Sequence, residues 1–260
     1  MSAIVLIPAR YASTRFPGKP LTLLKGRPVV QHVYENSLRS RLADDVIVAT
    51  DSETIFETVL SFGGKAVVTS GDHASGTDRI AEAAASMDHD IIVNVQGDEP
   101  LIRGEMIDEV ITLLDDRAAS IGTLAKRITL WREVFDPNVV KVVLDPEGFA
   151  FYFSRAPIPY HRDLFGAEAR RGGTEEGICT AGTSGFFMYK HIGIYSYRKD
   201  VLAALSSLPP TRLEGIERLE QLRAIENNFR IKVRETFFET MGVDTPEDLE
   251  RIEKCLNSSS

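Results

Sequence analysis

The sequence predicts an α/β fold in which a mostly parallel sheet is joined to a smaller antiparallel region. In the first half of the chain, short continuous apolar runs suited to strands buried on both faces alternate with helical patterns. In the second half the runs become aromatic and β-branched, which is typical of antiparallel strands. Of the 260 residues, 43% are hydrophobic and 26% are charged, and this composition supports a full-sized core. We expect a single domain with two parts, residues 1–130 and 131–260.

Strands and helices are expected to alternate through the first half. The expected strands are 4–8, 46–50, 66–69 and 91–95. The expected helices are 28–38, 53–62, 77–87 and 105–114. Because right-handed crossovers connect strands in this order, the strands should be parallel to one another.

The second half begins with a predicted hairpin. Residues 139–145 and 149–155 are β-rich and flank a Pro-Glu-Gly turn, and residues 191–198 form a further run of this kind. Between them, residues 162–185 contain six glycines and no periodicity, so we expect a loop or lid there. Helical patterns return at 214–227 and 245–256.

Charge and cysteine content exclude several classes of function. The 30 Lys and Arg residues against 38 Asp and Glu residues give a net charge of −8, which argues against a protein that tracks nucleic-acid phosphates. No uncharged apolar run approaches the ~20 residues of a membrane helix, so we expect neither a membrane span nor a signal peptide. The two cysteines, Cys179 and Cys255, lack the spacing of a zinc site or a disulfide framework. We therefore expect a cytoplasmic protein.

A cationic loop directly follows the first expected strand. Residues 7–21 carry Arg10, Arg15 and Lys19 among Gly, Ser, Thr and Pro. Because ligands of open α/β sheets bind beyond the carboxyl ends of the strands, this loop suits a polyphosphate. The alternative is a solvated basic loop without function. No GxGxxG follows the strand, and Pro20 replaces the Ser or Thr of a P-loop, so neither a dinucleotide site nor a P-loop is expected.

Two carboxylates could hold a metal ion. Asp98 follows the apolar strand 91–95, and a carboxylate at such a strand end can bind magnesium together with substrate phosphate oxygens. The alternative is a simple turn, because Gly, Asp and Pro favour turns in any protein. Asp244 precedes the last expected helix and could complete the site, or it could only cap that helix.

The segment at 75–79 is expected to open a helix. Its sequence is SGTDR, with Ser75, Gly76 and Arg79, so its backbone N–H groups could face an anion or a base edge. Ser, Thr and Asp at this position are also ordinary capping residues.

Several polar residues of the second half are unremarkable when each is taken alone. They are Arg155, His191, Tyr195, Glu220 and Gln221. A strand aromatic is usually part of a core, and a helix such as LEQLR is usually a solvated face. No motif of a covalent nucleophile or of a zinc hydrolase occurs.

Taken in order, segments from residue 3 to about 253 closely resemble the 3-deoxy-manno-octulosonate (KDO) cytidylyltransferases, the CMP-KDO synthetases. The segments are IPARYASTRFPGKPL, VATD, SGTDR, NVQGDEPLI, VKVVLD, YFSRAPIP, HIGIYSYR, LEQLR and GVDTPEDLE. The loop pattern of PAR, SxR and PxK is shared with other sugar nucleotidyltransferases. The segments NVQGDEP, YFSR and HxGxYxYR are more specific to the KDO family.

The resemblance implies a Rossmann-like nucleotidyltransferase fold, a three-layer sandwich with a CTP-binding part at 1–130. A sugar-binding and dimerisation part would occupy 131–260. It implies transfer of CMP from CTP to KDO, with Mg²⁺ as cofactor, in the cytoplasmic supply of KDO for lipopolysaccharide. It also implies a homodimer, and small-molecule substrates rather than nucleic acid or membrane as partners.

Carried over by motif, the resemblance assigns roles to individual residues. The residues implied to bind CTP are Arg10, Arg15, Lys19, Ser75, Gly76, Arg79 and Asp98. Of these, Arg10, Lys19 and Asp98 are implied to act in catalysis, and Asp98 and Asp244 to bind metal. The residues implied to bind KDO are Gln96, Arg155, His191, Tyr195, Glu220 and Gln221. We identify no side-chain general base, so catalysis is expected to depend on positioning and charge neutralisation.

Other functions stay open at this point. The glycine-rich connection at 162–190 is longer than expected for the family, so a modified KDO, such as an amino analogue, could be the substrate. Another acidic sugar or alcohol would also suit the cationic loop. A non-catalytic module that binds CTP is the alternative from outside the enzymes.

Overall fold

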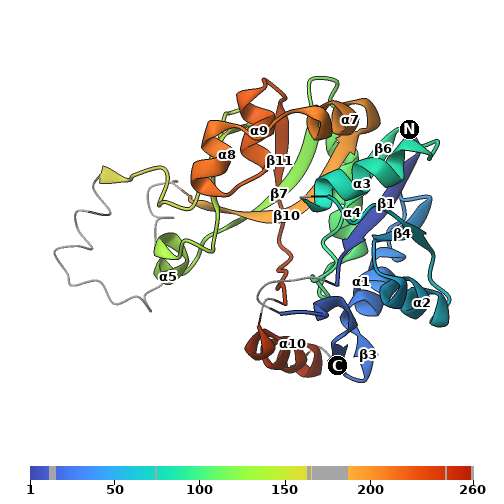
Figure 1. Ribbon diagram of the computed structural model, residues 1–260. Helices are drawn as coiled ribbons and strands as arrows, with labels where there is room; N and C mark the ends of the chain where they lie inside the picture. The colour runs from blue at the N-terminus through green and yellow to red at the C-terminus, as the bar shows by residue number, and fades with distance from the viewer. Residues whose placement is uncertain (12–15, 74, 163–164, 166–186, 244, 259–260) are drawn as a thin grey trace.

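The structure is a computed structural model of the chain, and it describes residues 1–11, 16–73, 75–162, 165, 187–243 and 245–258. One nine-stranded sheet runs through it, in the order β11-β7-β10-β6-β1-β4-β5, with β8 and β9 attached to β10 (Figure 1). Helices cover both faces, so the predicted α/β class with a mainly parallel sheet is confirmed.

The first half forms the parallel part of the sheet. β1 (Ala3–Ala9) lies between β4 (Asp45–Thr50) and β6 (Ile91–Asn94), and β5 (Ala66–Val68) forms the edge beside β4. All four strands are parallel, as predicted. Their connecting helices are α1 (Val29–Ser37), α2 (Glu53–Ser61), α3 (Gly76–Ala85) and α4 (Gly104–Leu113).

The antiparallel strands of the second half continue the same sheet. β10 (Tyr189–Arg198) runs antiparallel between β6 and β7 (Ile121–Arg127), and the predicted hairpin is formed by β8 (Lys141–Leu144) and β9 (Ala150–Ser154). β11 (Ile231–Glu235) pairs parallel with β7. The sequence interpretation did not identify β7 or β11.

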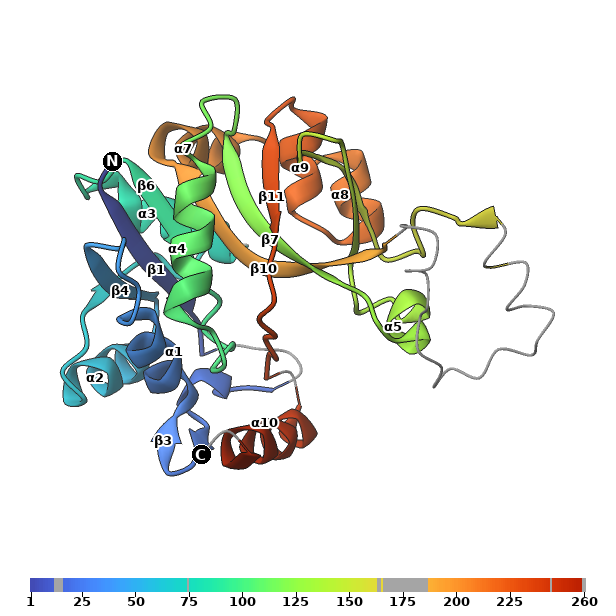
Figure 2. The ribbon, with the colours of Figure 1, turned by 180° about the vertical axis from the view of Figure 1, so that it is seen from behind.

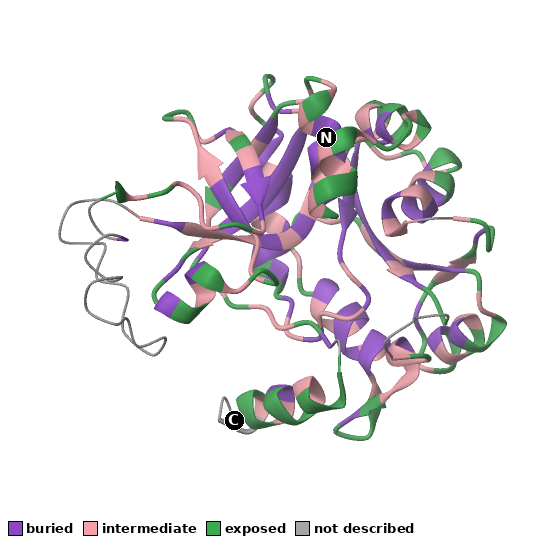
Figure 3. Ribbon diagram, turned by 60° about the vertical axis from the view of Figure 1, so that its left-hand side comes forward, coloured by how far each residue is buried: buried purple, intermediate pink, exposed green. Residues whose placement is uncertain are grey.

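Two apolar layers hold the sheet between its helices. α1, α2 and α4 pack on one face, and α3, α7 (Lys199–Ser207) and α9 (Gln221–Glu226) pack on the other (Figures 1 and 2). Along β6, Ile91 and Val93 belong to the first layer, while Ile92 belongs to the second. Buried residues concentrate on the central strands, and exposed residues lie on the outer sides of the helices (Figure 3).

The predicted helix at 214–227 is wrong as a single element. The chain forms α8 (Arg212–Glu217) and then α9, because Arg218 adopts a left-handed conformation with φ 55°. The carbonyl of Glu217 accepts a hydrogen bond of 2.7 Å from Arg155 Nε instead of continuing a helix. This break turns the start of α9 towards the sheet.

Short elements complete the fold. They are the 3₁₀ helix η1 (Lys19–Leu21), the hairpin of β2 (Leu23–Leu24) and β3 (Arg27–Pro28), and α5 (Trp131–Phe135). α10 (Pro246–Ser258) lies beside the β2–β3 hairpin, far from α7 to α9 (Figure 1). The loop or lid expected at 162–185 falls almost entirely outside the described residues.

Candidate active site

Three chain segments meet at the carboxyl end of β1, around Pro8. A Cβ atom added to Gly97, in the loop after β6, would lie 2.7 Å from Pro8 O. A Cβ atom added to Gly76, at the start of α3, would lie 3.2 Å from Pro8 Cγ. A side chain at position 97 would therefore force the backbones apart, and glycine permits the close approach. The residues that follow β1, β6 and the α3 start are consequently neighbours.

The cationic loop reaches the loop after β6. Lys19, the first residue of η1, forms an ion pair with Asp98, and the Lys19 side chain is only 13% exposed. Gly18, with φ 72°, donates its N–H to Tyr11 O at 3.0 Å and closes the loop before Lys19. Arg10 follows β1 and is exposed. The structure thus brings Lys19 and Asp98 together and places Arg10 directly after β1, while Arg15 lies outside the described residues.

The segment leading into α10 is bound to this same loop. Val243 N donates a hydrogen bond of 2.9 Å to Asp98 O. Burial, together with the charge of Asp98, raises the pKa of Glu99 to about 7, against the opposing effects of a hydrogen bond from Thr240 and the charge of Lys19. Burial therefore favours the protonated form of Glu99 more than the form of an exposed glutamate.

One predicted metal ligand, Asp98, lies within the described residues, and its carboxylate could contribute to a magnesium site that substrate oxygens complete. Asp98 has a carboxylate with 31% side-chain exposure beside the cationic loop, and Mg²⁺ commonly takes one or two carboxylates with waters and phosphate oxygens. Among the described residues, no three Asp, Glu, His or Cys side chains are grouped as a metal cage. Asp244 lies outside the described residues. At the start of α10, Thr245 N and Oγ1 donate to Asp248 at 2.9 and 3.1 Å, so this helix end is already capped.

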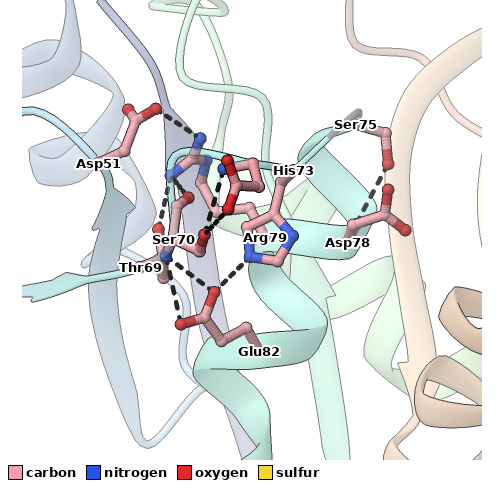
Figure 4. Close-up of polar contacts among 9 residues, drawn as sticks. Asp51, Thr69, Ser70, His73, Ser75, Asp78, Arg79 and Glu82 are labelled. Atoms are coloured by element: carbon pink, nitrogen blue, oxygen red, sulfur yellow. Dashed lines mark hydrogen bonds and ion pairs between the residues drawn. The ribbon is translucent and has the colours of Figure 1, made fainter.

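The start of α3 is held by a cap and by a buried ion pair. Ser75 Oγ accepts a hydrogen bond of 3.1 Å from Asp78 N, which confirms the predicted helix start (Figure 4). Arg79 is 2% exposed and lies 3.1 Å from Asp51 Oδ2 and 2.5 Å from Thr69 Oγ1 (Figure 4). This guanidinium joins α3 to the ends of β4 and β5. The structure thus places Arg79 behind the helix start, where it positions the segment, whereas Ser75 and Gly76 lie at the junction itself.

A pocket of about 170 Å³ opens between the α3 start, β6, β10 and α9. Four of the residues predicted to bind sugar line it: Gln96, Tyr195, Glu220 and Gln221. Glu220 Oε1 accepts a hydrogen bond of 3.0 Å from Ser75 Oγ. Burial raises the pKa of Glu220, while the hydroxyl groups of Ser75 and Thr77 lower it. One carboxylate therefore connects the start of α3 to the predicted sugar pocket.

His191 lies beside this pocket, on β10. Its ring centroid is 5.0 Å from that of Phe153 and 5.3 Å from that of Tyr195, and Nε2 lies 3.0 Å from Thr123 Oγ1. Burial lowers the pKa of His191 to about 3, so the imidazole is neutral at pH 7. Thr123 donates its single hydroxyl proton to Ile194 O at 2.7 Å. The Thr123 oxygen is then the acceptor towards His191, and His191 Nε2–H is the donor. His191 also lines a larger hollow of about 820 Å³ that reaches Glu99.

Arg155 is the one predicted sugar ligand that the structure directs elsewhere. Its Nε and NH1 donate to the carbonyls of Glu217 and Pro137 at 2.7 and 2.8 Å, and it lines neither hollow. The guanidinium stabilises the break between α8 and α9. A role for Arg155 towards a sugar carboxylate stays a prediction.

Three residues at this site were missed by the sequence interpretation. Thr77, Asn94 and Tyr197 line the same pocket as Glu220. A signal existed for Asn94, since it is the one polar residue of the apolar run 91–95. Thr77 and Tyr197 look like ordinary helix-start and strand residues, and only the folded chain brings them together.

Comparisons with known proteins agree on one family. The family model described as cytidylyltransferase matches residues 4–254. A 3-deoxy-manno-octulosonate cytidylyltransferase of Thermodesulfovibrio yellowstonii is 52% identical over 268 aligned residues. The alignment covers 100% of this chain and 100% of the relative. Its counterpart in Geobacter metallireducens is 51% identical over 258 residues, which cover 99% of this chain and 98% of the relative.

A solved structure extends the similarity to three dimensions. The structure of CMP:2-keto-3-deoxy-manno-octonic acid synthetase complexed with CTP has a TM-score of 0.88 and 39% sequence identity, with 100% of both chains covered. Within the part of this chain that the structure describes, no helix is long and apolar enough to cross a membrane.

The neutral imidazole predicts a pH dependence of stability. The pKa of His191 is about 3 in the folded chain and about 6.5 in the unfolded chain. Between these pH values only the unfolded chain binds the proton, so the protein should become less stable as the pH is lowered from 6.5. Relative to His191→Gln, which keeps an N–H for Thr123, the wild-type free energy of unfolding should fall by up to roughly 1.4 kcal/mol per pH unit. Urea titrations of both proteins from pH 7 to pH 4 measure this. Parallel curves would contradict the assignment.

Proposed function

The chain belongs to the cytidylyltransferase family, and from this premise we propose that it transfers CMP from CTP to the anomeric hydroxyl of KDO. The products are CMP-KDO and pyrophosphate. The two relatives at 51–52% identity are named for this activity, and their alignments cover 99–100% of this chain. The structural observation that carries the proposal is the junction at Pro8, because it sets the Lys19–Asp98 pair beside the α3 start, which Glu220 joins to the pocket.

The reaction is an in-line displacement at phosphorus. The anomeric oxygen forms a bond to the α-phosphorus of CTP, the bond from that phosphorus to the bridging oxygen breaks, and pyrophosphate leaves with the electron pair. The hydroxyl proton is lost to solvent or to a phosphate oxygen. Such a reaction needs reactants held in line and negative charge offset, without a covalent enzyme intermediate.

Residues of the junction divide these tasks. We place the triphosphate against Arg10, Arg15 and Lys19, where Lys19 offsets charge on the departing pyrophosphate. The nucleoside lies towards Ser75 and Gly76, whose helix start is held from behind by Arg79. The sugar occupies the pocket of Gln96, Tyr195, Glu220 and Gln221. His191 contacts Tyr195 beside this pocket, and a role for Arg155, which directly follows β9, stays a prediction.

Asp98, together with Asp244, is proposed to hold Mg²⁺. Bound there, the ion would neutralise phosphate charge and lower the pKa of the attacking hydroxyl. Asp98 is suited to this because its carboxylate is accessible and is fixed through its own backbone by Val243. We further propose that the reaction takes place in the cytoplasm and supplies KDO for lipopolysaccharide.

Pyrophosphate release tests the proposed reaction. With magnesium, release should require both CTP and KDO, and it should be lost with UTP or ATP, without KDO, or with excess EDTA. An 8-amino analogue of KDO is tested in parallel. Release with the analogue alone would move the assignment to a modified KDO. CTP binding without release under any condition would contradict an enzymatic role.

Asp98→Asn tests the metal carboxylate. We expect turnover to fall by at least about 100-fold, because the amide of asparagine lacks the negative charge that balances the cationic side chains and the proposed magnesium ion. The matched control is Asp88→Asn, an exposed aspartate that precedes the same strand at its opposite end. Both variants should remain folded at the assay temperature, and Asp98→Asn should be the less stable one because it loses the ion pair with Lys19. A near-normal rate for Asp98→Asn would remove Asp98 from the proposed site.

We also propose that the chain forms a homodimer through its second part. Support comes from the family resemblance and from an aromatic cluster there, in which exposed Phe135 and Tyr160 both contact Phe165. Large exposed aromatic groups of this kind favour association. Light scattering at micromolar concentration should give twice the chain mass of 28.8 kDa. A monomer mass would contradict the proposal.

A further inference from the structure

Asn94 is a buried polar residue whose carboxamide oxygen is left unsatisfied. It lies at the end of β6, pairs in register with Leu6 of β1 and Tyr195 of β10, and is 1% exposed. Its Oδ1 has no hydrogen-bond partner among the residues that the structure describes. Side chains alternate along a strand, so Asn94 points to the same face as Ile92, in the apolar layer under α3 and α7.

An unsatisfied buried amide is costly for the free protein. A polar group left without its hydrogen bond costs the full desolvation penalty, whereas an apolar residue of similar shape at the same place can be neutral or stabilising. The strand neighbours show that this layer accepts aliphatic side chains, since Leu6 and Ile92 are both fully buried in it. Folding alone therefore gives no reason for asparagine at position 94.

The surroundings of Asn94 supply a reason. It lines the 170 Å³ pocket together with polar groups of Thr77, Gln96, Tyr195 and Glu220. These groups come from α3, the loop after β6, β10 and the start of α9, so they approach the pocket from several sides. Apolar side chains, including Ile121 and Ile231, complete the lining. Several hydrogen-bonding groups set in a partly apolar pocket suit a ligand with hydroxyl groups.

We propose that Asn94 is a specificity-determining residue of the sugar site, whose carboxamide is satisfied by a hydroxyl group of the bound sugar acid. This inference rests on the proposed function and extends it to a residue beneath the predicted ligands. A site built to bond a hydroxyl discriminates strongly against analogues that lack it, because its buried polar group is then left unpaired. The free protein carries the unsatisfied amide, and the sugar complex satisfies it.

Asn94→Leu separates binding from folding. The variant should have at least about tenfold higher KM for KDO, an unchanged KM for CTP, and a melting temperature equal to or above that of the wild type. KDO in the presence of CMP should raise the melting temperature of the wild type and not that of the variant. If leucine proves too large to fold, Asn94→Val provides the same comparison.

Ile92→Val is the matched control, since it alters the same face of the same strand. It should lose stability and keep the wild-type KM for KDO, which is the opposite pattern. An Asn94→Leu protein that is less stable than the wild type, or that keeps its KM for KDO, would overturn the inference while the wild type still releases pyrophosphate. A wild type that releases none with KDO would overturn the proposed function, and the inference with it.

Discussion

The close approach of two glycines, Gly97 and Gly76, to the backbone and the ring of Pro8 is the constraint on which the rest of the site depends. Gly97 brings the loop after β6 against the carboxyl end of β1, and Gly76 brings the α3 start against the other side of the same proline. Neither contact involves a functional side chain. Yet these contacts place Lys19 within reach of Asp98, and Ser75 within reach of Glu220. Because packed backbone is hard to displace, the polar groups inherit fixed positions from it.

The charged groups at this junction include the Lys19–Asp98 pair and the exposed Arg10. Lys19 is paired with Asp98, and an ammonium group has three donors, so it can keep that carboxylate while it meets a phosphate oxygen. Two neighbouring groups have shifted pKa values: burial lowers the pKa of His191, which is neutral at pH 7, and raises the pKa of Glu99.

The sequence allowed prediction of the parallel half of the fold because its strands are apolar runs, of which β1 and β6 are buried on both faces. β7 and β11 were missed because their sequences, IGTLAKR and IKVRE, mix charged residues with apolar ones at the end of the sheet. The helix at 214–227 failed because its break depends on Arg155, which is about 60 residues away and binds the carbonyl of Glu217. Local patterns carry no information on such a contact.

The candidate site, too, could be predicted only in part from the sequence. Arg10, Lys19 and Asp98 could be proposed because charged residues in the loops after strands are visible in sequence. Arg79 is a cation too, but it lies buried against Asp51. Only tertiary packing distinguishes these cations. Glu220 is an example: its carboxylate accepts a hydrogen bond from Ser75, which also caps α3. The pocket proposed for the sugar and the helix start proposed for the nucleotide are therefore linked by one hydrogen bond. Movement of either group changes the environment of the other, and the two halves of the site are thereby one physical unit.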